Sequence, residues 1–268
     1  MRRTLGSRTT TALTAALLLA ATTVFTTGAA PAAAAGTVKV MDFNICGAIC
    51  NHGGYGVVED VRNRVLRFKP AILTLNEICA GQFTRLTSRL KGSAWEMSGV
   101  FRPQRHDSRC PGGGFGDAIL TAGAVGRREV LPLPNLGPEH RAILCLRTSA
   151  AGPVLACTLH LVTGRGTKGS REKYLQSAAA ARALNGRAVR GAVIVGGDFN
   201  LVPGQMGALL DAGRGGRFFD VDPQAAGTHG KKIDYILFSR AHFTGPSGGP
   251  EWSKYSDHRA LLGQATRR

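Results

Sequence analysis

The chain has 268 residues, of which 43% are hydrophobic and 19% charged, a composition that supports one large folded domain and argues against intrinsic disorder. Its 34 Lys and Arg residues exceed its 17 Asp and Glu residues, so its formal net charge is +17 at pH 7. An excess of basic residues favours polyanionic partners such as nucleic acid, an anionic membrane surface or a cell-wall polymer. General solubility is the alternative explanation.

Residues 1–35 have the composition of a secretory signal peptide. Three arginines precede the apolar run ALTAALLLAATTVF at 12–25, and an A-x-A pattern ends the segment at 33–35. Because the run is shorter than the roughly 20 apolar residues of a membrane span, we expect cleavage near residue 35 rather than a retained anchor. Cleavage would export residues 36–268 as one domain and lower the net charge from +17 to +14, since three arginines and no acidic residue are removed.

The first predicted elements are two strands with a helix between them. The alternating segment TVKVMDFN predicts a strand over 37–44 that ends on Asn44. Apolar residues at helical spacing predict a helix over 57–68. The apolar segment AILTLNE predicts a buried strand over 71–77 that ends on Glu77. Both strands therefore end on a polar side chain.

The middle of the chain combines a predicted loop, a hairpin and a helix. Residues 102–117 are rich in Gly, Pro and charge, so we expect an irregular basic loop there, followed by a strand over 118–123. Two apolar runs flank the turn sequence SAAGP and predict a hairpin over 142–162. After another basic loop, Ser170 is expected to cap a helix over 171–190.

Three more strands are predicted over 192–197, 232–239 and 255–264, with a Gly-rich linker before the second. The first of them leads directly to Asp198 and Asn200. Strands outnumber helices, and hairpins occur together with crossovers, which favours a mixed-sheet α/β sandwich over a parallel Rossmann sheet.

The six cysteines all lie in residues 36–268, and an even count in an exported chain favours three disulfides. Cys145 and Cys157 are equidistant from the turn of the predicted hairpin, so we expect them to lie opposite each other and to pair. Among the three possible pairings of the other four, we choose Cys46–Cys50 with Cys79–Cys110. Zinc ligation is the competing explanation, but the sequence has neither C-x-x-C pairs nor suitably spaced histidines.

Eight polar residues lie at or next to the ends of the predicted strands. Each has a structural explanation by itself, such as a turn cap for Asn44, core hydrogen bonding for His160, or an ion pair with a neighbouring lysine for Asp234. Independent structural uses would not place all eight beside strand ends in an otherwise apolar pattern, so we interpret them as one site. They are Asn44, Glu77, His160, Asp198, Asn200, Asp234, Asp257 and His258.

The local sequence around these residues resembles that of the endonuclease/exonuclease/phosphatase superfamily, a group of metal-dependent phosphodiesterases that includes pancreatic-type deoxyribonuclease. The matching segments span 42–261 and are DFN, LNE, GDAILTA, TLHL, GGDFN, IDYIL and SDHRAL. GGDFN, IDYIL and SDH in this order are the most specific. The chain departs from the usual pattern in having LNE where L-Q-E is more common, and Cys46 where some relatives carry Asp.

The resemblance implies an α/β fold, a four-layer sandwich of two packed mixed β-sheets flanked by helices, with the active site at one end of the sheets. It also implies that residues 36–268 form one catalytic domain with a Mg²⁺ cofactor, for which Mn²⁺ could substitute. Hard carboxylate and amide oxygens suit Mg²⁺. We expect Glu77 to be the main metal ligand, with Asn44 and Asp257 near the metal.

The remaining site residues have expected roles in moving protons and holding phosphate. Asp198 would orient and deprotonate the attacking water, and Asn200 would fix the phosphate or that water. Asp234 would pair with His258, raising the basicity of the imidazole and fixing its tautomer. His160 would donate to a phosphate oxygen or protonate the leaving oxygen. Either histidine could act as the acid or as the base.

Several other residues have both a functional and a simpler interpretation. Arg141 stands just before a strand, where relatives often carry a phosphate-binding arginine, and a solvated side chain is the alternative. Asp117 could orient a site histidine, but a turn is the preferred interpretation. Tyr235 is expected in the core. Five further histidines lie in loop-like sequence and are expected to be exposed: His52, His106, His140, His229 and His242.

Two basic clusters fall in loops expected to border the site. Such loops can follow a phosphate backbone, with a solvated surface as the alternative. We therefore interpret the chain as a secreted, Mg²⁺-dependent phosphodiesterase of nucleic acid, preferably a DNA endonuclease, acting as a monomer without stable membrane insertion. The clusters are Arg102, Arg105 and Arg109, and then Arg165, Lys168, Arg171 and Lys173.

Two alternative functions remain open. A secreted sphingomyelinase or phospholipase C-type phosphodiesterase of the same superfamily would need an exposed apolar or aromatic hairpin, for which EWSKY at 251–255 is the nearest candidate. An inactive basic nucleic-acid-binding protein belongs to a different class, and the complete set of site residues argues against it.

Overall fold

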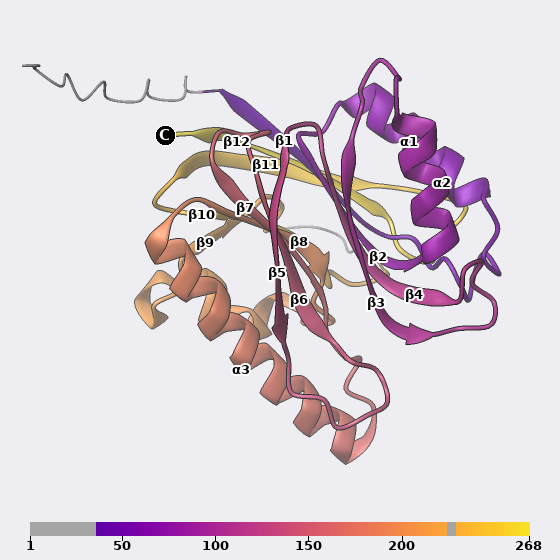
Figure 1. Ribbon diagram of the computed structural model, residues 1–268. Helices are drawn as coiled ribbons and strands as arrows, with labels where there is room; N and C mark the ends of the chain where they lie inside the picture. Colours follow the sequence, from indigo (N-terminus) through magenta and orange to yellow (C-terminus); the bar gives the residue numbers. More distant parts are fainter. Residues whose placement is uncertain (1–35, 224–228) are drawn as a thin grey trace, which may run out of the picture. The chain divides into compact units, whose positions relative to one another are not determined.

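Two six-stranded β-sheets form the framework of the protein in the computed structural model (Figure 1). The structure describes residues 36–223 and 229–268, so the predicted signal peptide at 1–35 lies outside the described residues. Within this described part, no helix combines the length and the hydropathy that crossing a membrane requires.

The first sheet is mixed, and its parallel pair is β1 and β2. Helix α1 (Gly56–Phe68) connects these two strands, and α2 (Ala80–Leu90) follows the second of them. All other neighbouring strands of this sheet are antiparallel. In spatial order the strands are β11 (Phe243–Glu251), β12 (Ala260–Arg267), β1 (Thr37–Asn44), β2 (Ile72–Cys79), β4 (Gly114–Thr121) and β3 (Ser98–His106).

The second sheet repeats this plan with β7 and β8 as its parallel pair. The long helix α3 (Gly166–Arg190) connects them. Three short helices follow β8, namely η1 (Pro203–Gln205), α4 (Gly207–Leu210) and η2 (Ala212–Arg214). In spatial order the strands are β5 (Val125–Pro132), β6 (Ala142–Thr148), β7 (Val154–His160), β8 (Val193–Asp198), β10 (Asp234–Ser239) and β9 (Phe218–Asp220).

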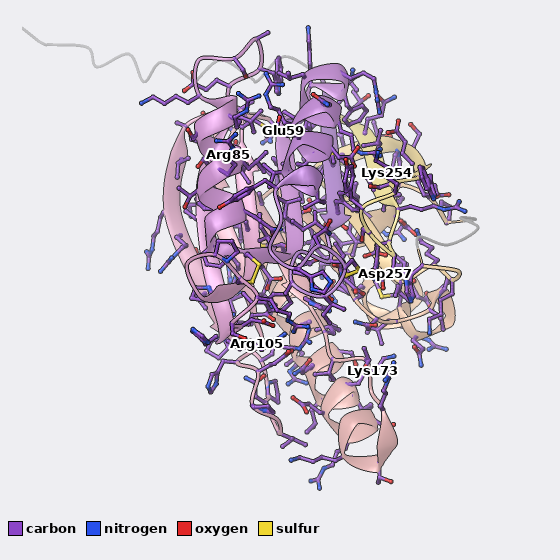
Figure 2. All side chains as sticks on the ribbon, turned by 90° about the vertical axis from the view of Figure 1, so that its right-hand side faces the viewer. Glu59, Arg85, Arg105, Lys173, Lys254 and Asp257 are labelled. Carbon is purple, nitrogen blue, oxygen red and sulfur yellow. A yellow bond between two sulfur atoms is a disulfide. The ribbon has the colours of Figure 1, made fainter. Side chains whose placement is uncertain are left out.

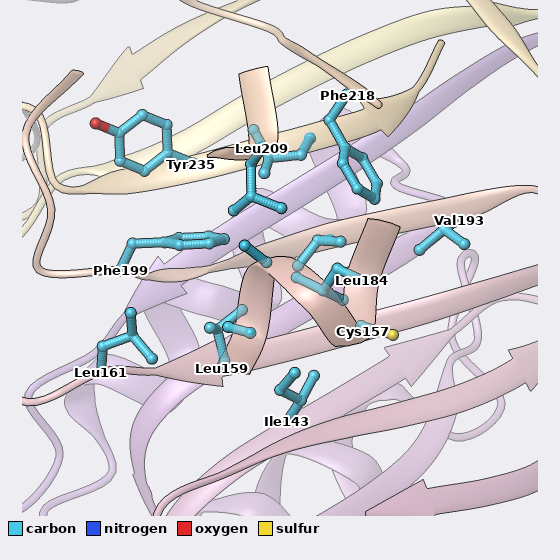
Figure 3. Packing of buried hydrophobic residues seen from close by; sticks show 14 of the residues in the cluster. Ile143, Cys157, Leu159, Leu161, Leu184, Val193, Phe199, Leu209, Phe218 and Tyr235 are labelled. Carbon is cyan, nitrogen blue, oxygen red and sulfur yellow. The ribbon is translucent and has the colours of Figure 1, made fainter. Parts of the chain in front are cut away.

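Three hydrophobic clusters separate four layers. The middle cluster, which includes Val40 and Ile236, lies between the two sheets. On one outer face, α1 buries a valine stripe at helical spacing, including Val61, against the first sheet. On the other, Leu184 of α3 packs with Leu159 of β7 (Figure 3). The four-layer α/β sandwich of two mixed sheets is therefore confirmed.

The two parallel pairs explain why polar residues gather in one place. The carboxyl ends of parallel neighbours lie at the same edge of a sheet. Asn44 of β1 is opposite Asn76 of β2, and His160 of β7 is opposite Asp198 of β8. A hydrogen bond of 3.2 Å from Asn44 Nδ2 to Asp198 Oδ2 connects the two pairs. The strand ends of both sheets thus meet at one edge of the sandwich.

The prediction of an irregular loop over 102–117 is wrong for most of that segment. β3 and β4 pair antiparallel across it, and only residues 107–113 lie outside the strands. β3 is an edge strand with a neighbour on one side only. An edge strand tolerates Pro103 and charged side chains because its outer backbone groups face solvent.

Two other predicted boundaries differ from the structure. α3 begins at Gly166, and Ser170 lies inside the helix, where its Oγ donates to the backbone oxygen of Gly164 instead of capping. The last strand begins only at Ala260, so the SDH motif lies in the loop before β12. The sequence patterns also did not predict α2 or the edge strands β5, β9 and β11.

The three disulfides chosen from the sequence are confirmed. Cys145 and Cys157 are bonded and are register partners in β6 and β7. Cys46–Cys50 closes a short loop after β1. Cys79–Cys110 connects the end of β2 to the β3–β4 connection. No cysteine in the described residues is free.

Candidate active site

One amide holds the carboxylates of the two sheets together. Asn44 Nδ2, at the end of β1, donates to Glu77 Oε1 at 3.2 Å and to Asp198 Oδ2 at 3.2 Å. Asn44 Oδ1 accepts a hydrogen bond of 3.1 Å from the backbone N–H of Cys46. The amide is therefore fixed with its nitrogen directed toward the two carboxylates.

Glu77 has a backbone conformation that is unusual for a residue with a side chain. Its φ angle is +56°, and the register of β2 with β4 shifts between Leu75 and Ile78. A left-handed non-glycine residue costs on the order of 1 kcal/mol and persists only where the surrounding structure enforces it. Bulges beside functional sites redirect side chains. Here the Glu77 carboxylate reaches Asn44 while its side chain stays 19% exposed.

Asp198 lies between two imidazole rings at the end of β8. Its Oδ2 is 3.5 Å from His160 Nε2 and 3.8 Å from His258 Nε2. Its Oδ1 accepts a hydrogen bond of 2.9 Å from the backbone N–H of Asn200, which also has a positive φ of +51°. Asn200 Nδ2 donates to the backbone oxygen of Leu161 at 2.9 Å, so its side chain fastens the segment after β8 to the segment after β7.

Asp234 and His258 form a buried carboxylate–histidine pair. Asp234 begins β10 opposite Asp198, and its Oδ2 is 2.8 Å from His258 Nδ1. Burial lowers the pKa of His258, but the hydrogen bond and charge of Asp234, together with the charge of Asp198, outweigh burial and raise the pKa to about 9. His258 is therefore protonated on both ring nitrogens at neutral pH.

His160 is in the opposite state. Burial lowers its pKa well below the ordinary value, and the Arg141 cation lowers it further. Among the described residues, no group hydrogen-bonds to His160 Nδ1. At neutral pH the site thus contains one neutral and one cationic imidazole, each facing the same carboxylate oxygen of Asp198.

The carboxylates carry more negative charge than the protein compensates. Burial, followed by the charge of Asp234, raises the pKa of Asp198 well above its ordinary value. Burial also raises the pKa of Glu77, against the opposing hydrogen bond from Asn44. A raised carboxyl pKa means that the ionised form lacks sufficient partners. A divalent cation would supply the missing positive charge, and oxygen donors of this kind suit Mg²⁺ or Mn²⁺.

The sequence and the fold both match one known family. The family model described as "Endonuclease/Exonuclease/phosphatase family" matches residues 43–258, which include every strand end of the site. The chain belongs to this family. Members of the endonuclease/exonuclease/phosphatase family act as hydrolases on phosphodiesters and phosphate esters. No curated protein matches the chain significantly.

Solved structures with this fold align along most of the chain. An endonuclease/exonuclease/phosphatase from Beutenbergia cavernae is 17% identical with a TM-score of 0.70, over 86% of this chain and 72% of that one. The human Nocturnin catalytic domain with bound sulfate anion is 19% identical, with a TM-score of 0.66 over 87% and 94%. D. rerio TDP2, complexed with a single-strand DNA product, is 16% identical, with a TM-score of 0.63 over 85% and 98%. At these identities the similarity establishes the fold.

Asn76 supports the candidate site through hydrogen bonds, a role that the sequence patterns did not predict. Its Oδ1 accepts a hydrogen bond of 2.8 Å from the backbone N–H of Asp198. Its Nδ2 donates to Asp117 Oδ1 at 2.7 Å and to Thr158 Oγ1 at 3.3 Å. Asn76 therefore connects β2 to both strands of the parallel pair in the other sheet. A polar residue inside an otherwise apolar strand is the signal that marks it.

Two buried aspartates lie within strands near the site. The interpretation of Asp117 as a turn residue is wrong, because it is a fully buried residue of β4 that accepts hydrogen bonds from Asn76 and Gln104. Burial raises the pKa of Asp117 to about 6. Asp42 was not singled out from the sequence. Its Oδ1 accepts a hydrogen bond of 2.6 Å from Thr74 Oγ1, and burial raises its pKa well above the ordinary value.

Arg141 lies beneath the end of β7. Its guanidinium donates from one nitrogen to the backbone oxygens of His160 and Leu161, at 2.9 and 3.1 Å, and from another to Glu139. Its side chain is buried. These contacts hold the backbone that carries His160, and a contact with phosphate stays a prediction.

The rim of the site includes His229, which the sequence patterns did not place there. His229 is exposed, as expected, but its ring stacks on His258 with centroids 4.6 Å apart. Its Nδ1 is 3.6 Å from Asp257 Oδ2, and Asp257 Oδ1 is 3.6 Å from the disulfide sulfur of Cys50. Because 29 positions separate the two stacked histidines, no local pattern indicated their contact. The exposed Asp257 carboxylate thus lies between the His229 ring and the Cys46–Cys50 disulfide.

The two basic clusters have different surroundings. Arg102 donates to the backbone oxygen of His140, and both Arg105 and Arg109 form ion pairs of 2.7 Å with Asp107. The first cluster is therefore largely satisfied by protein partners. The second lies at the start of α3 rather than in a loop. Figure 2 shows Lys173 of that cluster on α3, on the same side of the molecule as Asp257.

Proposed function

We propose that this protein is a secreted, metal-dependent phosphodiesterase that hydrolyses nucleic acid, preferably as a DNA endonuclease. One observation carries the proposal. The Asp198 carboxylate lies between the imidazole rings of His160 and His258, and Asn44 connects it to a partly exposed Glu77. This arrangement provides a base, an acid and an oxygen ligand close together, with both imidazoles within 4 Å of the Asp198 carboxylate.

Glu77 is the residue best suited to hold the metal. It is partly exposed, burial raises its pKa, and the charge of Asp257 raises it further. Asp257 would act as a second carboxylate near the ion. Asn44 directs its nitrogen toward Glu77 and uses its oxygen for the Cys46 N–H, so in this arrangement it positions Glu77. When bound, Mg²⁺ or Mn²⁺ would neutralise charge on the phosphoryl oxygens.

Asp198 is the proposed general base. Its Oδ1 is held by the Asn200 N–H, while its Oδ2 accepts a hydrogen bond from Asn44 and faces the two rings, where it would accept a proton from water. The cationic His258 favours the ionised form of Asp198 and, with a proton on Nε2, would donate to the phosphoryl group or to the leaving oxygen. Neutral His160 would donate an N–H to a phosphate oxygen without adding charge.

The choice of nucleic acid rests on charge and on similar proteins. Residues 36–268 carry a net charge of +14, which favours a polyanion over a neutral ester. The D. rerio TDP2 structure holds a single-strand DNA product, and the Nocturnin structure holds a sulfate anion. Export is supported by the three disulfides, since these persist in oxidising compartments, and by the composition of residues 1–35.

A lipid phosphodiester is the second candidate substrate. Trp252, in the segment 251–255, is 69% exposed, and Ile49 in the Cys46–Cys50 loop is 56% exposed. Exposed apolar side chains beside a phosphodiesterase site would suit contact with a membrane surface. The same catalytic residues would then act on a choline phosphodiester.

Nicking of supercoiled plasmid by the oxidised protein tests the proposal. Cleavage should require Mg²⁺ or Mn²⁺, stop in EDTA, and fall at least 100-fold in His258→Ala and Glu77→Gln, since each removes an acid or a metal ligand. Sphingomyelin hydrolysis is measured in parallel. Lipid hydrolysis with intact plasmid would show that the substrate is a lipid phosphodiester rather than nucleic acid. DNA retention without cleavage would indicate an inactive nucleic-acid-binding protein.

A further inference from the structure

A groove lies along one face of α3. Its volume is about 700 Å³. One wall is a face of α3, and the opposite wall is the segment from Leu201 to Arg214, which follows the catalytic strand β8. Gly164, in the loop between β7 and α3, forms its near end. The backbone N–H of Val162 donates to Gln176 Oε1 at 3.1 Å, which fixes this loop against the helix.

The α3 wall presents one face of the helix. Its residues recur at helical spacing, from Lys173 and Tyr174 through Ser177 and Ala178 to Ala181. At 1.5 Å per residue this face is about 12 Å long. That length corresponds to roughly three stacked nucleotides at 3.4 Å each. The small side chains leave the floor open for a planar group.

The chemistry of the walls suits single-stranded nucleic acid. Tyr174 is 71% exposed, the most exposed of the large hydrophobic side chains in the described residues. Lys173 and Arg214 add positive charge, and none of the described residues that line the groove is acidic. A basic track with an exposed aromatic ring is the arrangement by which proteins bind unpaired bases, because stacking accepts any base while cations follow the backbone.

The groove is next to the proposed active site. Leu201 in its wall directly follows Asn200, whose N–H holds Asp198. Burial and the charge of Lys231 lower the pKa of Lys173, while the charge of Asp198 raises it. Lys173 is therefore within electrostatic range of the catalytic carboxylate, at the end of the groove nearest the reaction.

We propose that this groove binds the unpaired nucleotides next to the scissile phosphate, with one base stacked on Tyr174 and backbone phosphates held by Lys173 and Arg214. This inference rests on the proposed function and narrows its substrate. In a duplex, neighbouring base pairs cover both faces of each base, so stacking on Tyr174 requires a single strand or a frayed end. The protein therefore prefers single-stranded regions over intact duplex.

A second hollow provides a contrast. It has a volume of about 500 Å³ and lies at the opposite ends of β7 and β8, beside Val154 and Val193. Its wall contains Glu129, which is 3.1 Å from Arg187 and 3.5 Å from Arg147. These arginines already have a carboxylate partner, and the hollow lies at the far end of the strands from Asp198. The α3 groove differs because it lies beside the site and contains Lys173, which forms no ion pair within the described residues, although its Arg214 pairs with Asp211 at 3.3 Å.

Fluorescence anisotropy tests the proposal with the full oxidised protein. The parent is His258→Ala in EDTA, so that the probe is not cleaved. The probe is a labelled DNA strand of about 12 nucleotides, a length within the range of known single-strand sites, compared with the blunt duplex of the same sequence. Tyr174→Ala should weaken binding of the single strand about tenfold, because one stacking contact is lost. Tyr174→Phe keeps the ring and should bind as the parent does.

Two controls make the outcome specific. Trp252→Ala removes another exposed aromatic side chain outside the groove and should leave strand binding unchanged. Duplex binding should change less than about twofold in Tyr174→Ala, which would remove the preference for the single strand. If Tyr174→Ala binds the strand as tightly as the parent, the groove proposal is overturned. The groove proposal is also overturned if Tyr174→Ala leaves strand binding intact and weakens binding to sphingomyelin vesicles. Failure of the proposed function is a separate result, seen when the wild-type protein with Mg²⁺ cleaves neither the plasmid nor the labelled strand.

Discussion

The charge of His258 depends on a single neighbouring carboxylate, Asp234. Asp234→Asn keeps the size of the side chain and removes its charge. We expect the pKa of His258 to fall from about 9 toward its ordinary 6.5. Activity at neutral pH should fall roughly 10²- to 10⁴-fold, the usual contribution of a positioned acid or base. The pH profile of kcat/KM measures this, and its alkaline limb should move to lower pH.

The pH dependence of the free energy of unfolding should follow the protonation of His258. The folded pKa of His258 lies above its unfolded value, so its contribution is fully present below pH 6.5 and is lost as the pH rises through about 9. The unfolding free energy of the wild type should therefore decline over this interval more steeply than that of Asp234→Asn. Asp60→Asn removes a carboxylate paired with Arg64 on α1 and serves as the control. Identical pH profiles in the wild type and Asp234→Asn would contradict the assignment.

Asn76 offers a second test at the scale of one residue. Asn76→Ala leaves the Asp198 N–H without its acceptor and removes a donor from the buried Asp117 carboxyl. We expect a loss of about 2–4 kcal/mol in the free energy of unfolding, because buried polar groups lose their partners. Urea denaturation measures this loss. Asn63→Ala, at an exposed position of α1, should change stability by less than about 0.5 kcal/mol. Equal stabilities of the two variants would refute a supporting role for Asn76.

The disulfides close loops of different lengths, which predicts different contributions to the free energy of unfolding. Cys79–Cys110 closes a separation of 31 residues, whereas Cys46–Cys50 closes one of 4. Chain entropy predicts losses of about 4 kcal/mol and about 2 kcal/mol when each pair is replaced by alanine. Urea unfolding of the two double variants measures the difference. A larger loss for the short loop would show that contacts of that loop, rather than chain entropy, dominate its contribution.

At the scale of elements, the sequence predicted the interior of the sheets and failed at their borders. Central strands such as β1, β2, β8 and β10 are buried on both faces and read as apolar runs. The edge strands β3, β5, β9 and β11 carry polar residues, glycine or proline, because their outer sides face solvent. Their formation depends on a neighbour that is distant in sequence, so a local pattern does not indicate them.

The candidate site follows the same division. The polar ends of the central strands were predictable because a carboxylate or histidine contrasts with an apolar run. Asn76 and Asp42 lie inside such strands, and their partners Asp198 and Thr74 become visible only when the strands pack. His229 meets His258 through the return of a distant loop. Contacts between elements, rather than residue types, are what the sequence left undetermined.

At the scale of the whole molecule, the position of the charge matters more than its total. Ion pairs satisfy two arginines of the 102–109 cluster, whereas the basic residues at the start of α3 remain available beside the site. Nucleic-acid binding should therefore depend on one half of α3. The net charge of +14 on residues 36–268 would otherwise predict binding spread over the surface.

The salt dependence of binding separates these two possibilities. For a single strand, the slope of log affinity against log salt is about −0.7 per neutralised phosphate. Lys168→Ala combined with Arg171→Ala, in the His258→Ala background, should flatten the slope by about 1.4, since two phosphate contacts are lost. Arg182→Ala combined with Arg190→Ala removes the same charge from the distal half of the same helix and should leave the slope unchanged. If both pairs flatten it equally, net charge attracts the nucleic acid and α3 does not orient it. If only the Lys168 and Arg171 pair flattens the slope, the start of α3 contacts the phosphates. The position of these cations would then align the strand with the groove and with Asp198.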